Sequence, residues 1–125
     1  MITLSKDTLE AEEYLKHWMA GDEEVYVPEL NLAMDSVAVE DPAFAKQVIE
    51  FIPGYIEREP MDWPIYAQCL AGYAVLEENR GDPTLALILQ KALEYKKRTS
   101  DGDLTMWHVN QGLRAIIYSI TGELV

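Results

Sequence analysis

Apolar residues recur along this chain at the three- and four-residue spacing of amphipathic helices, and the two-residue alternation typical of strands is nearly absent. Helix-start and turn signals divide the chain roughly every 12 to 20 residues, as in helical proteins. The pattern predicts an all-α fold of five to six antiparallel helices, either a bundle or a short stack of helical hairpins. The length of 125 residues fits one domain over residues 1–125.

The first half of the chain divides at residues that start or stop helices. Asp7, followed three residues later by Glu10, resembles a capping box, and the Gly-Asp pair at 21–22 is expected to end the first helix. The next proline suits the first turn of a second helix, and Asp41 followed by proline favours the start of a third. The Pro-Gly pair at 53–54 is expected to end or kink that third helix.

The second half contains the most apolar helix of the chain. Asp62 opens it, residues 63–76 are apolar almost all round, and Arg80-Gly81 is expected to end it. We therefore place this helix, with the one that begins at Asp82, at the centre of the domain. Gly72 is expected to mark a close crossing by another helix, because glycine costs about 1 kcal/mol there against alanine. The inward faces expected of the last two helices are Leu85, Ile88, Leu89, Ala92 and Leu93, then Met106, Val109, Leu113, Ile116, Ile117 and Ile120, with Asp103 as the cap of the sixth helix.

A short pattern repeats along the chain. Asp41-Pro42 recurs 41 residues later as Asp82-Pro83, and the segments beginning at Gln68 and Gln111 align at a shift of 43 residues. Both spacings match paired-helix repeats, although independent Asp-Pro helix caps would give the same match. The sequence leaves open whether the repeat is real.

Residues 70–95, LAGYAVLEENRGDPTLALILQKALEY, contain a Gly-Asp turn at 81–82, an alanine at position 86 and a Lys-Ala-Leu run at 91–93. These features resemble a tetratricopeptide helical hairpin over about a fifth of the chain. Glu77 stands where that family has an aromatic residue. The resemblance implies an antiparallel helix pair, and members of the family usually bind peptides or protein partners.

The charge of the chain is concentrated in its first half. Residues 1–62 hold 15 acidic and 4 basic residues and carry −11, whereas residues 63–125 hold 7 and 6 and carry −1. A field of this sign attracts basic surfaces and repels phosphate and anionic lipid. The one basic cluster, Lys96 to Arg98, suits the negative end of a helix dipole. We therefore expect a basic protein partner, and neither nucleic acid nor membrane.

No motif for catalysis or for a cofactor is present. The chain lacks a glycine-rich phosphate loop, a nucleophile elbow and a repeated Glu-x-x-His motif, so we expect no catalytic residue, no metal and no cofactor. Cys69, the single cysteine, is expected to be a small buried apolar residue. His17, one turn after Glu13, is expected to form a surface pair with it, and His108 to hydrogen-bond beside its helix. The absence of a leader pattern and of a long apolar run favours a cytoplasmic protein.

The acidic runs at 10–13 and 22–24 remain as candidate binding residues. The simpler interpretation is a solvated helix surface, but the aromatic residues Tyr14 and Trp18 lie close by, and aromatic residues among acids are typical of interfaces. We predict that the partner-binding residues are Glu10, Glu13, Asp22, Glu23, Glu24 and Tyr26.

Three functions stay open at this point. The first is a non-catalytic inhibitor of the immunity type, which blocks a basic partner such as a nuclease toxin. The second is a helical-repeat adaptor or chaperone-like protein that holds a peptide in an apolar groove. The third is a small enzyme with an unrecognised site near Trp63 and Trp107. A homodimer is possible in each case, and the sequence shows no seam for it.

Overall fold

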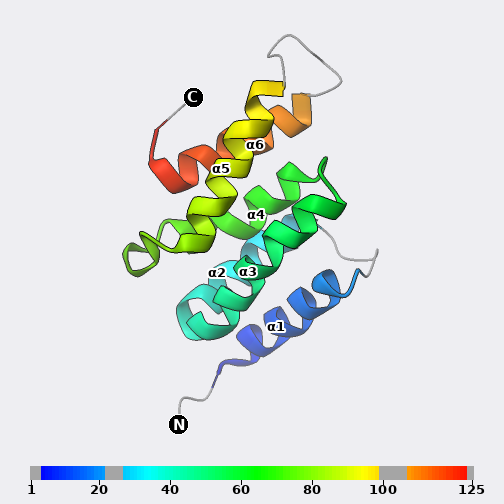
Figure 1. Cartoon of the computed structure of the whole chain (residues 1–125). Coiled ribbons are helices and arrows are strands. Elements are labelled where there is room, and N and C mark those ends of the chain that lie inside the picture. The colour runs from blue at the N-terminus through cyan, green and yellow to red at the C-terminus, as the bar shows by residue number, and fades with distance from the viewer. Residues whose placement is uncertain (1–3, 22–26, 99–106, 124–125) are drawn as a thin grey trace.

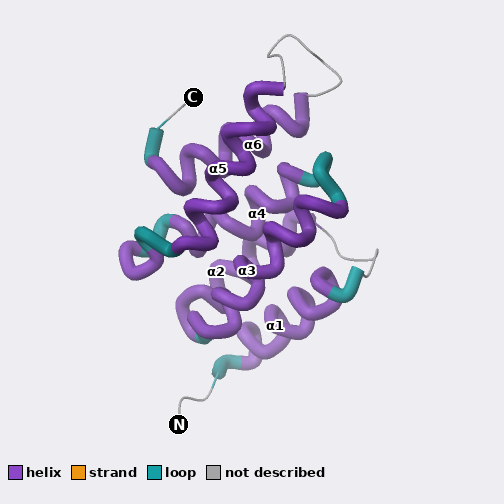
Figure 2. The backbone as a smooth tube through the Cα atoms, in the orientation of Figure 1, coloured by secondary structure: helices purple, strands orange, loops and turns teal. Residues whose placement is uncertain are grey.

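The computed structural model describes residues 4–21, 27–98 and 107–123, and every regular element in these ranges is helical (Figures 1 and 2). This confirms the all-α class predicted from the apolar spacing. The elements of the described residues are α1 Lys6–Met19, α2 Val27–Glu40, α3 Pro42–Arg58, α4 Trp63–Ala74, the short 3₁₀ helix η1 Glu77–Asn79, α5 Pro83–Arg98 and α6 Trp107–Thr121.

The helices lie in two layers. In one layer α2, α4 and α6 pack side by side with α4 in the middle. In the other layer are α1, α3 and α5, of which α3 and α5 are drawn in front of α4 and α6 in Figure 1. α1 packs chiefly on α2, and α5 packs chiefly on α6. The domain is thus a short two-layer stack of helices, one of the two architectures expected from the sequence.

α4 lies at the centre of the stack, as the sequence predicted, because it has no charged side chain that must reach water. Trp63, Tyr66, Cys69 and Leu70 are fully buried. The helix that follows Asp82 was expected at the centre too, and that prediction is wrong. α5 packs on α6 and α3 at one end of the stack.

The turn before α5 explains its position. The side-chain amide of Asn79 donates to the Tyr73 carbonyl at 2.8 Å, and the Tyr73 hydroxyl donates to the Asp82 carboxylate at 2.6 Å. Gly81 has φ of 82°, a left-handed conformation that favours glycine. α5 is thereby turned onto α6 and approaches α4 at few residues, among them Tyr95, whose ring packs on Trp63. Residues 70–95 therefore do not form the packed hairpin that the tetratricopeptide resemblance implies.

Both Asp-Pro pairs begin helices of the same layer. The Asp41 carboxylate accepts a hydrogen bond from the Phe44 amide at 3.3 Å at the start of α3, and Asp82 accepts one from Thr84 at 2.8 Å at the start of α5. In the other layer, α4 and α6 both begin at a tryptophan. The repeated sequence signals thus mark equivalent places in the stack.

Two predicted helix ends, at Asp7 and at Arg80-Gly81, are wrong, and of the two outcomes expected at Pro53-Gly54 a helix end is excluded. The N-cap of α1 is Ser5, whose hydroxyl accepts from the Thr8 amide at 3.2 Å, so Asp7 lies in the first turn and the expected capping box is absent. α3 continues through Pro53 to Arg58, because buried Ile56 and half-buried Tyr55 extend its apolar side beyond the proline. α4 ends at Ala74 rather than at Arg80-Gly81.

The expected inward faces are confirmed except at one described residue. Leu85, Ile88 and Ala92 of α5 are buried, but Leu93 is 42% exposed because it faces away from α6 and α3. Val109, Leu113, Ile116 and Ile117 of α6 are buried as expected. Asp103 and Met106 lie outside the described residues.

Two glycines let helix backbones touch within the layer of α2, α4 and α6. A methyl group on Gly112 of α6 would lie 2.5 Å from the Pro64 nitrogen and 2.6 Å from the Trp63 carbonyl carbon at the start of α4. A methyl group on Gly72 of α4 would meet Asp35 of α2. This confirms the close crossing expected at Gly72. The Gly112 contact is the stricter one, because two backbones form it.

Replacing Gly112 by alanine is expected to lower the free energy of unfolding by about 2 to 3 kcal/mol, because the methyl group forces two backbones apart. Urea unfolding followed by circular dichroism measures the change. Gly54→Ala is the control, because nothing lies within 4 Å of a methyl group there, and the better helix propensity should add up to about 1 kcal/mol. Equal stability of the two variants would show that α4 and α6 do not cross as closely as described.

Candidate partner-binding face

A shallow groove of about 500 Å³ lies between α1 and α2. Its walls carry the carboxylates of Asp7, Glu10 and Glu29, and no Lys or Arg is among the described residues that line it. The remaining lining residues are Ala11 and Tyr14 of α1 and Leu32, Ala33 and Ser36 of α2. The groove, which we call the α1–α2 groove, thus combines three negative charges with a small apolar floor.

Helix geometry places these residues. Asp7, Glu10 and Tyr14 follow one another at spacings of three and four residues, so they lie along one flank of α1. Ala11 and Ala33 are small and buried where the two helices meet, which keeps the groove floor close to the backbone. Leu32 also lines the groove and is 70% exposed, so its side chain is accessible there.

The wall formed by α1 is fastened to the rest of the stack at both ends. At its start, the hydroxyls of Ser5 and Thr8 donate to the Glu40 carboxylate at 2.9 and 2.5 Å. The hydrogen bond from Thr8 makes the largest contribution to lowering the pKa of Glu40, and those from Ser5 add to it. Near its end, the Trp18 ring packs on Phe51 and Tyr55 of α3, with ring centroids 5.5 and 5.3 Å away. The acids on α1 are therefore held in place rather than on a loose helix.

A pair of carboxyl groups lies where α1 meets the start of α3. A hydrogen bond between Glu12 and Asp41, helped by burial and by the charge of Asp41, raises the pKa of Glu12 to about 7, against the opposing effect of Lys16. The Oε1 atom of Glu12 is buried without a hydrogen-bond partner. Glu12 therefore retains its proton in mildly acidic solution and donates it to Asp41, which also caps α3.

The structure places one of the predicted site residues in the groove. Glu10 lines it, with its carboxylate 3.9 Å from Lys6 on the same helix. Glu13 is exposed but lies outside the groove, where it pairs with Lys16 at 3.4 Å, and its part in binding stays a prediction. Asp22, Glu23, Glu24 and Tyr26 lie outside the described residues.

Sequence reasoning missed Asp7, Glu29 and Leu32 as members of the site. Asp7 had been assigned to a helix cap, and Glu29 and Leu32 lie on a second helix whose rotation relative to α1 is a property of packing. The helical spacing of Asp7 from Glu10 was the available signal. Trp18, considered as a neighbour of the acids, is buried in the core instead.

A second hollow of about 680 Å³ lies between the end of α4, the start of α5 and the last turn of α6. Leu85, Leu89 and Ile120 contribute apolar surface to its lining, and Arg80 is the one cation among the lining residues. The Asp82 carboxylate also borders the hollow, but it already accepts from the Tyr73 hydroxyl and the Thr84 amide. This hollow therefore presents mainly apolar surface.

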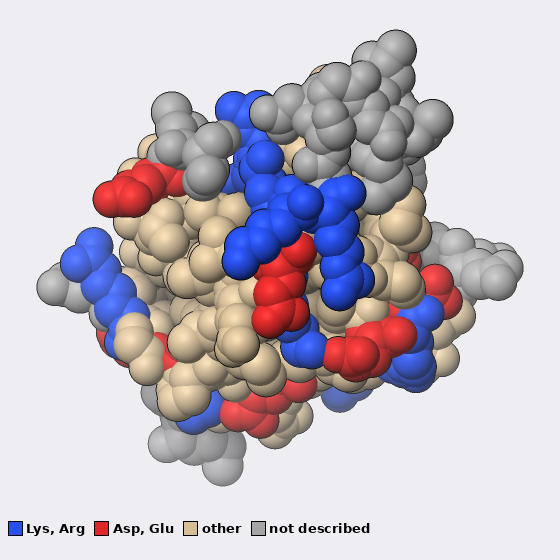
Figure 3. Space-filling view, turned by 45° about the horizontal axis from the view of Figure 1, so that its top comes forward, with Lys and Arg blue, Asp and Glu red and all other residues tan. Residues whose placement is uncertain are grey.

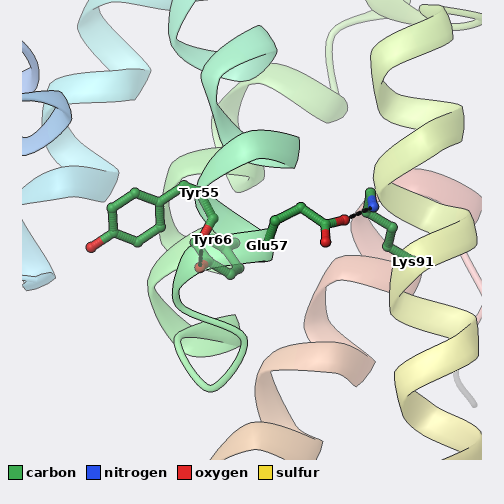
Figure 4. A network of polar contacts seen from close by, with 4 residues as sticks. All are labelled: Tyr55, Glu57, Tyr66 and Lys91. Atoms are coloured by element: carbon green, nitrogen blue, oxygen red, sulfur yellow. Dashed lines mark hydrogen bonds and ion pairs between the residues drawn. The ribbon is translucent and has the colours of Figure 1, made fainter.

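Basic side chains gather at the end of α5. Figure 3 shows Lys and Arg side chains with Asp and Glu between them on the face that this end presents. Lys91 pairs with Glu57 of α3 and lowers the pKa of Glu57, while Tyr55 points away from the pair (Figure 4). The Arg98 guanidinium lies 5.2 Å from the centroid of the Tyr95 ring. These contacts favour a structural role for the cations at the α3–α5 contact.

Cys69 and the two histidines lie on three different helices. Cys69 is fully buried, and burial raises the pKa of its thiol. His17 and His108 are exposed on α1 and α6. Within the described residues, no three His, Cys, Asp or Glu side chains lie close enough together to hold a metal ion. Trp63 packs in the core against Tyr66 and Tyr95, whereas Trp107 is half exposed.

Comparison with protein-family models, with curated proteins and with solved structures found no match to this chain. Among the described helices, none has both the length and the apolar character needed to cross a bilayer. The features that bear on function are therefore the α1–α2 groove and the hollow between α4, α5 and α6.

Stability is expected to fall as the pH rises from 4.5 to about 7, because folded Glu12 binds its proton more tightly than unfolded Glu12 does. Glu12→Gln retains a donor to Asp41 and removes this titration. The variant should therefore exceed the parent protein in stability at pH 8 by about 1 kcal/mol, a figure reduced for solvent screening. Chemical unfolding of both proteins at a series of pH values measures the difference. Glu13→Gln on the same helix serves as control, and a pH profile unchanged by Glu12→Gln would disprove the shared proton.

Proposed function

We propose that this chain is a cytoplasmic, non-catalytic protein-binding domain whose α1–α2 groove receives a basic segment of a partner protein. The observation that carries the proposal is the groove itself, where Asp7, Glu10 and Glu29 stand around a small apolar floor; no described Lys or Arg lines it, and the nearby Lys6 pairs with Glu10 at 3.9 Å. Carboxylates that converge on a groove recognise Arg or Lys side chains, and the floor accepts the apolar stems of those side chains.

The charge distribution supports the same kind of partner. Residues 1–62 carry −11, so the half of the chain that forms the groove attracts a basic surface before contact. The short-range contacts then come from the groove acids and from Tyr14 and Leu32, which line the same groove. Electrostatic steering of this kind raises association rates more than it raises affinity.

An inhibitor of the immunity type fits these features best. A nuclease toxin has a basic cleft for the phosphates of its substrate, and an acidic domain that binds near such a cleft competes with the substrate by charge and by volume. No catalytic group on the inhibitor is needed for that effect. Glu10, retained from the sequence prediction, belongs to this proposed interface together with Asp7 and Glu29.

The hollow between α4, α5 and α6 favours a second candidate, an adaptor that binds a peptide. Its volume of about 680 Å³ and its lining by Leu85, Leu89 and Ile120 suit an apolar side chain of a partner. Binding there would depend weakly on salt, because apolar contact dominates it. The salt dependence of binding therefore separates the two candidates.

The triple substitution Asp7→Asn, Glu10→Gln and Glu29→Gln is expected to slow association with a basic partner about tenfold or more in low salt, and to flatten the dependence of the rate on salt. The partner is first captured from a native cell lysate at low salt, eluted with a salt gradient and identified by mass spectrometry. Surface plasmon resonance with that purified partner then measures the rate constants.

The matched control replaces three exposed acids elsewhere, Glu50, Glu78 and Glu94, by glutamine and so changes the net charge equally. If both triple variants slow association to the same extent, the overall charge and not the groove attracts the partner. If the captured partner binds the groove variant as rapidly as it binds the parent protein, the assignment of the groove is wrong.

A further inference from the structure

The hollow between α4, α5 and α6 has one cation and one acid among the described residues that line it, Arg80 and Asp82. The Asp82 carboxylate already accepts hydrogen bonds from the Tyr73 hydroxyl at 2.6 Å and from the Thr84 amide at 2.8 Å. Arg80 is exposed, and no carboxylate of the described residues lies within ion-pair distance of it. The guanidinium of Arg80 is therefore the charged group of the hollow that can bind a ligand.

The backbone at Arg80 is held on both sides. Before it, the side-chain amide of Asn79 donates to the Tyr73 carbonyl at 2.8 Å. After it, Gly81 has φ of 82°, and the Asp82 amide donates to the Asn79 carbonyl at 3.2 Å. This hydrogen-bonded turn limits where the guanidinium can lie, so the cation stays at the edge of the hollow.

The start of α5 also borders the hollow, but it offers an anion few N–H groups. Pro83 has no N–H, and the Thr84 amide is bound to the Asp82 carboxylate. An anionic ligand in the hollow is therefore expected to bind Arg80 rather than the end of the helix.

Apolar side chains surround the rest of the hollow. Leu85 is buried, Leu89 and Ile120 are half-buried, and Val75 and Tyr118 are 65% and 51% exposed. The volume of about 680 Å³ lies within the usual range of ligand pockets, about 300 to 1,000 Å³. Covering such side chains stabilises a complex. The ligand that suits the hollow thus carries an apolar group beside its anion.

The last turn of α6 adds hydrogen-bond acceptors, beside the start of α5 (Figure 1). The Tyr118 carbonyl accepts from the Gly122 amide at 2.7 Å. The next three carbonyls, those of Ser119, Ile120 and Thr121, have no later helix amide to bond, and all three residues line the hollow. A ligand with N–H groups supplies donors for such carbonyls, whereas a fatty acid does not.

We propose that this hollow binds the carboxyl terminus of a partner polypeptide whose last residue is apolar. Charge complementarity favours this occupant, because a terminal carboxylate forms a hydrogen-bonded ion pair with the unpaired Arg80. In a terminal residue the carboxylate and the side chain are attached to the same carbon atom, so one residue meets both the cation and the apolar lining. The backbone N–H groups of the peptide supply the donors for the α6 carbonyls.

This proposal rests on the second candidate function, the peptide-binding adaptor, and not on the α1–α2 groove. The groove acids belong to α1 and α2, whereas α4, α5 and α6 form the hollow. Residues 63–125, which include the hollow, carry −1, so this half of the chain does little to repel a carboxylate. The two sites can therefore be tested separately.

Fluorescence anisotropy with labelled tetrapeptides tests the proposal. Five peptide pools, randomised at the first three positions, end in Val, Leu, Ile, Phe or Met, and each is made with a free carboxyl group and with a terminal carboxamide. We expect at least one free-acid pool to bind the full chain with a dissociation constant below about 1 mM. Its carboxamide should bind about tenfold more weakly, because it lacks the charge that pairs with Arg80.

Arg80→Gln should weaken binding of the free acid about tenfold and leave binding of the carboxamide unchanged, because the two changes remove the same interaction. A merely structural role of Arg80 would weaken both ligands alike. Arg114→Gln is the matched control, since it removes the same charge from an exposed arginine of α6 that does not line the hollow.

A second variant fills the hollow instead of changing its charge. Ala86 is exposed and lines the hollow, so the indole of Ala86→Trp should occupy the ligand's place and abolish binding. Leu87→Trp places the same group on α5 outside the hollow and should leave binding intact. Circular dichroism confirms that each variant is folded.

Three results would overturn the proposal. The first is that no free-acid pool binds at about 1 mM, and the second is a carboxamide that binds as tightly as its free acid. The third is displacement of the labelled peptide by dodecanoate at a lower concentration than by unlabelled peptide, because a fatty acid is then the better occupant. Only the purified chain and synthetic ligands are present, so failure of the partner capture at the α1–α2 groove leaves these results unaffected.

Discussion

The contact between the backbones of α4 and α6 at Gly112 constrains the rest of the fold. Side chains adapt to a neighbour by changing rotamer, but two backbones in contact have no such freedom, so their distance and crossing are fixed together. Gly112 rests on Trp63 and Pro64 at the start of α4, and this fixes where the Trp63 ring enters the core against Tyr66 and Tyr95. Tyr95 lies on α5, and Tyr66 packs on Tyr55 of α3, so these rings link both helices to α4.

An uncharged central helix also decides where the charges of the chain go. α4 has no charged residue and α6 has only Arg114, so the acids and bases of the described helices fall mainly on α1, α2, α3 and α5. The acidic groove between α1 and α2 is one result of this distribution of charge. Asp35 is an exception to the separation of charge from α4, because its side chain lies against Gly72 at the contact between α2 and α4.

The sequence predicted much of this architecture, because the period of apolar residues and the caps at Asp41 and Asp82 act between residues that are close in sequence. Other features depended on contacts between distant segments. The residues around Pro53 do not show that the helix continues through it. The helix continues because Ile56, one turn later, is buried in the core. The groove was partly predictable through Glu10, but its Glu29 wall depends on how α2 is rotated against α1, which only packing determines. The same reason explains why Leu93, apolar and correctly spaced, nevertheless faces water.

The way α1 is attached has a consequence for motion in the native state. Among the described helices, α1 packs chiefly on α2 and α3, and polar groups on Glu40 and Asp41 form part of its anchorage, whereas α4 is enclosed on several sides. Local opening therefore begins at α1, at a free energy below that of global unfolding, and its amides exchange with solvent before those of α4. A ligand held between α1 and α2 binds only the closed form, so its binding free energy is added to the stability of that helix.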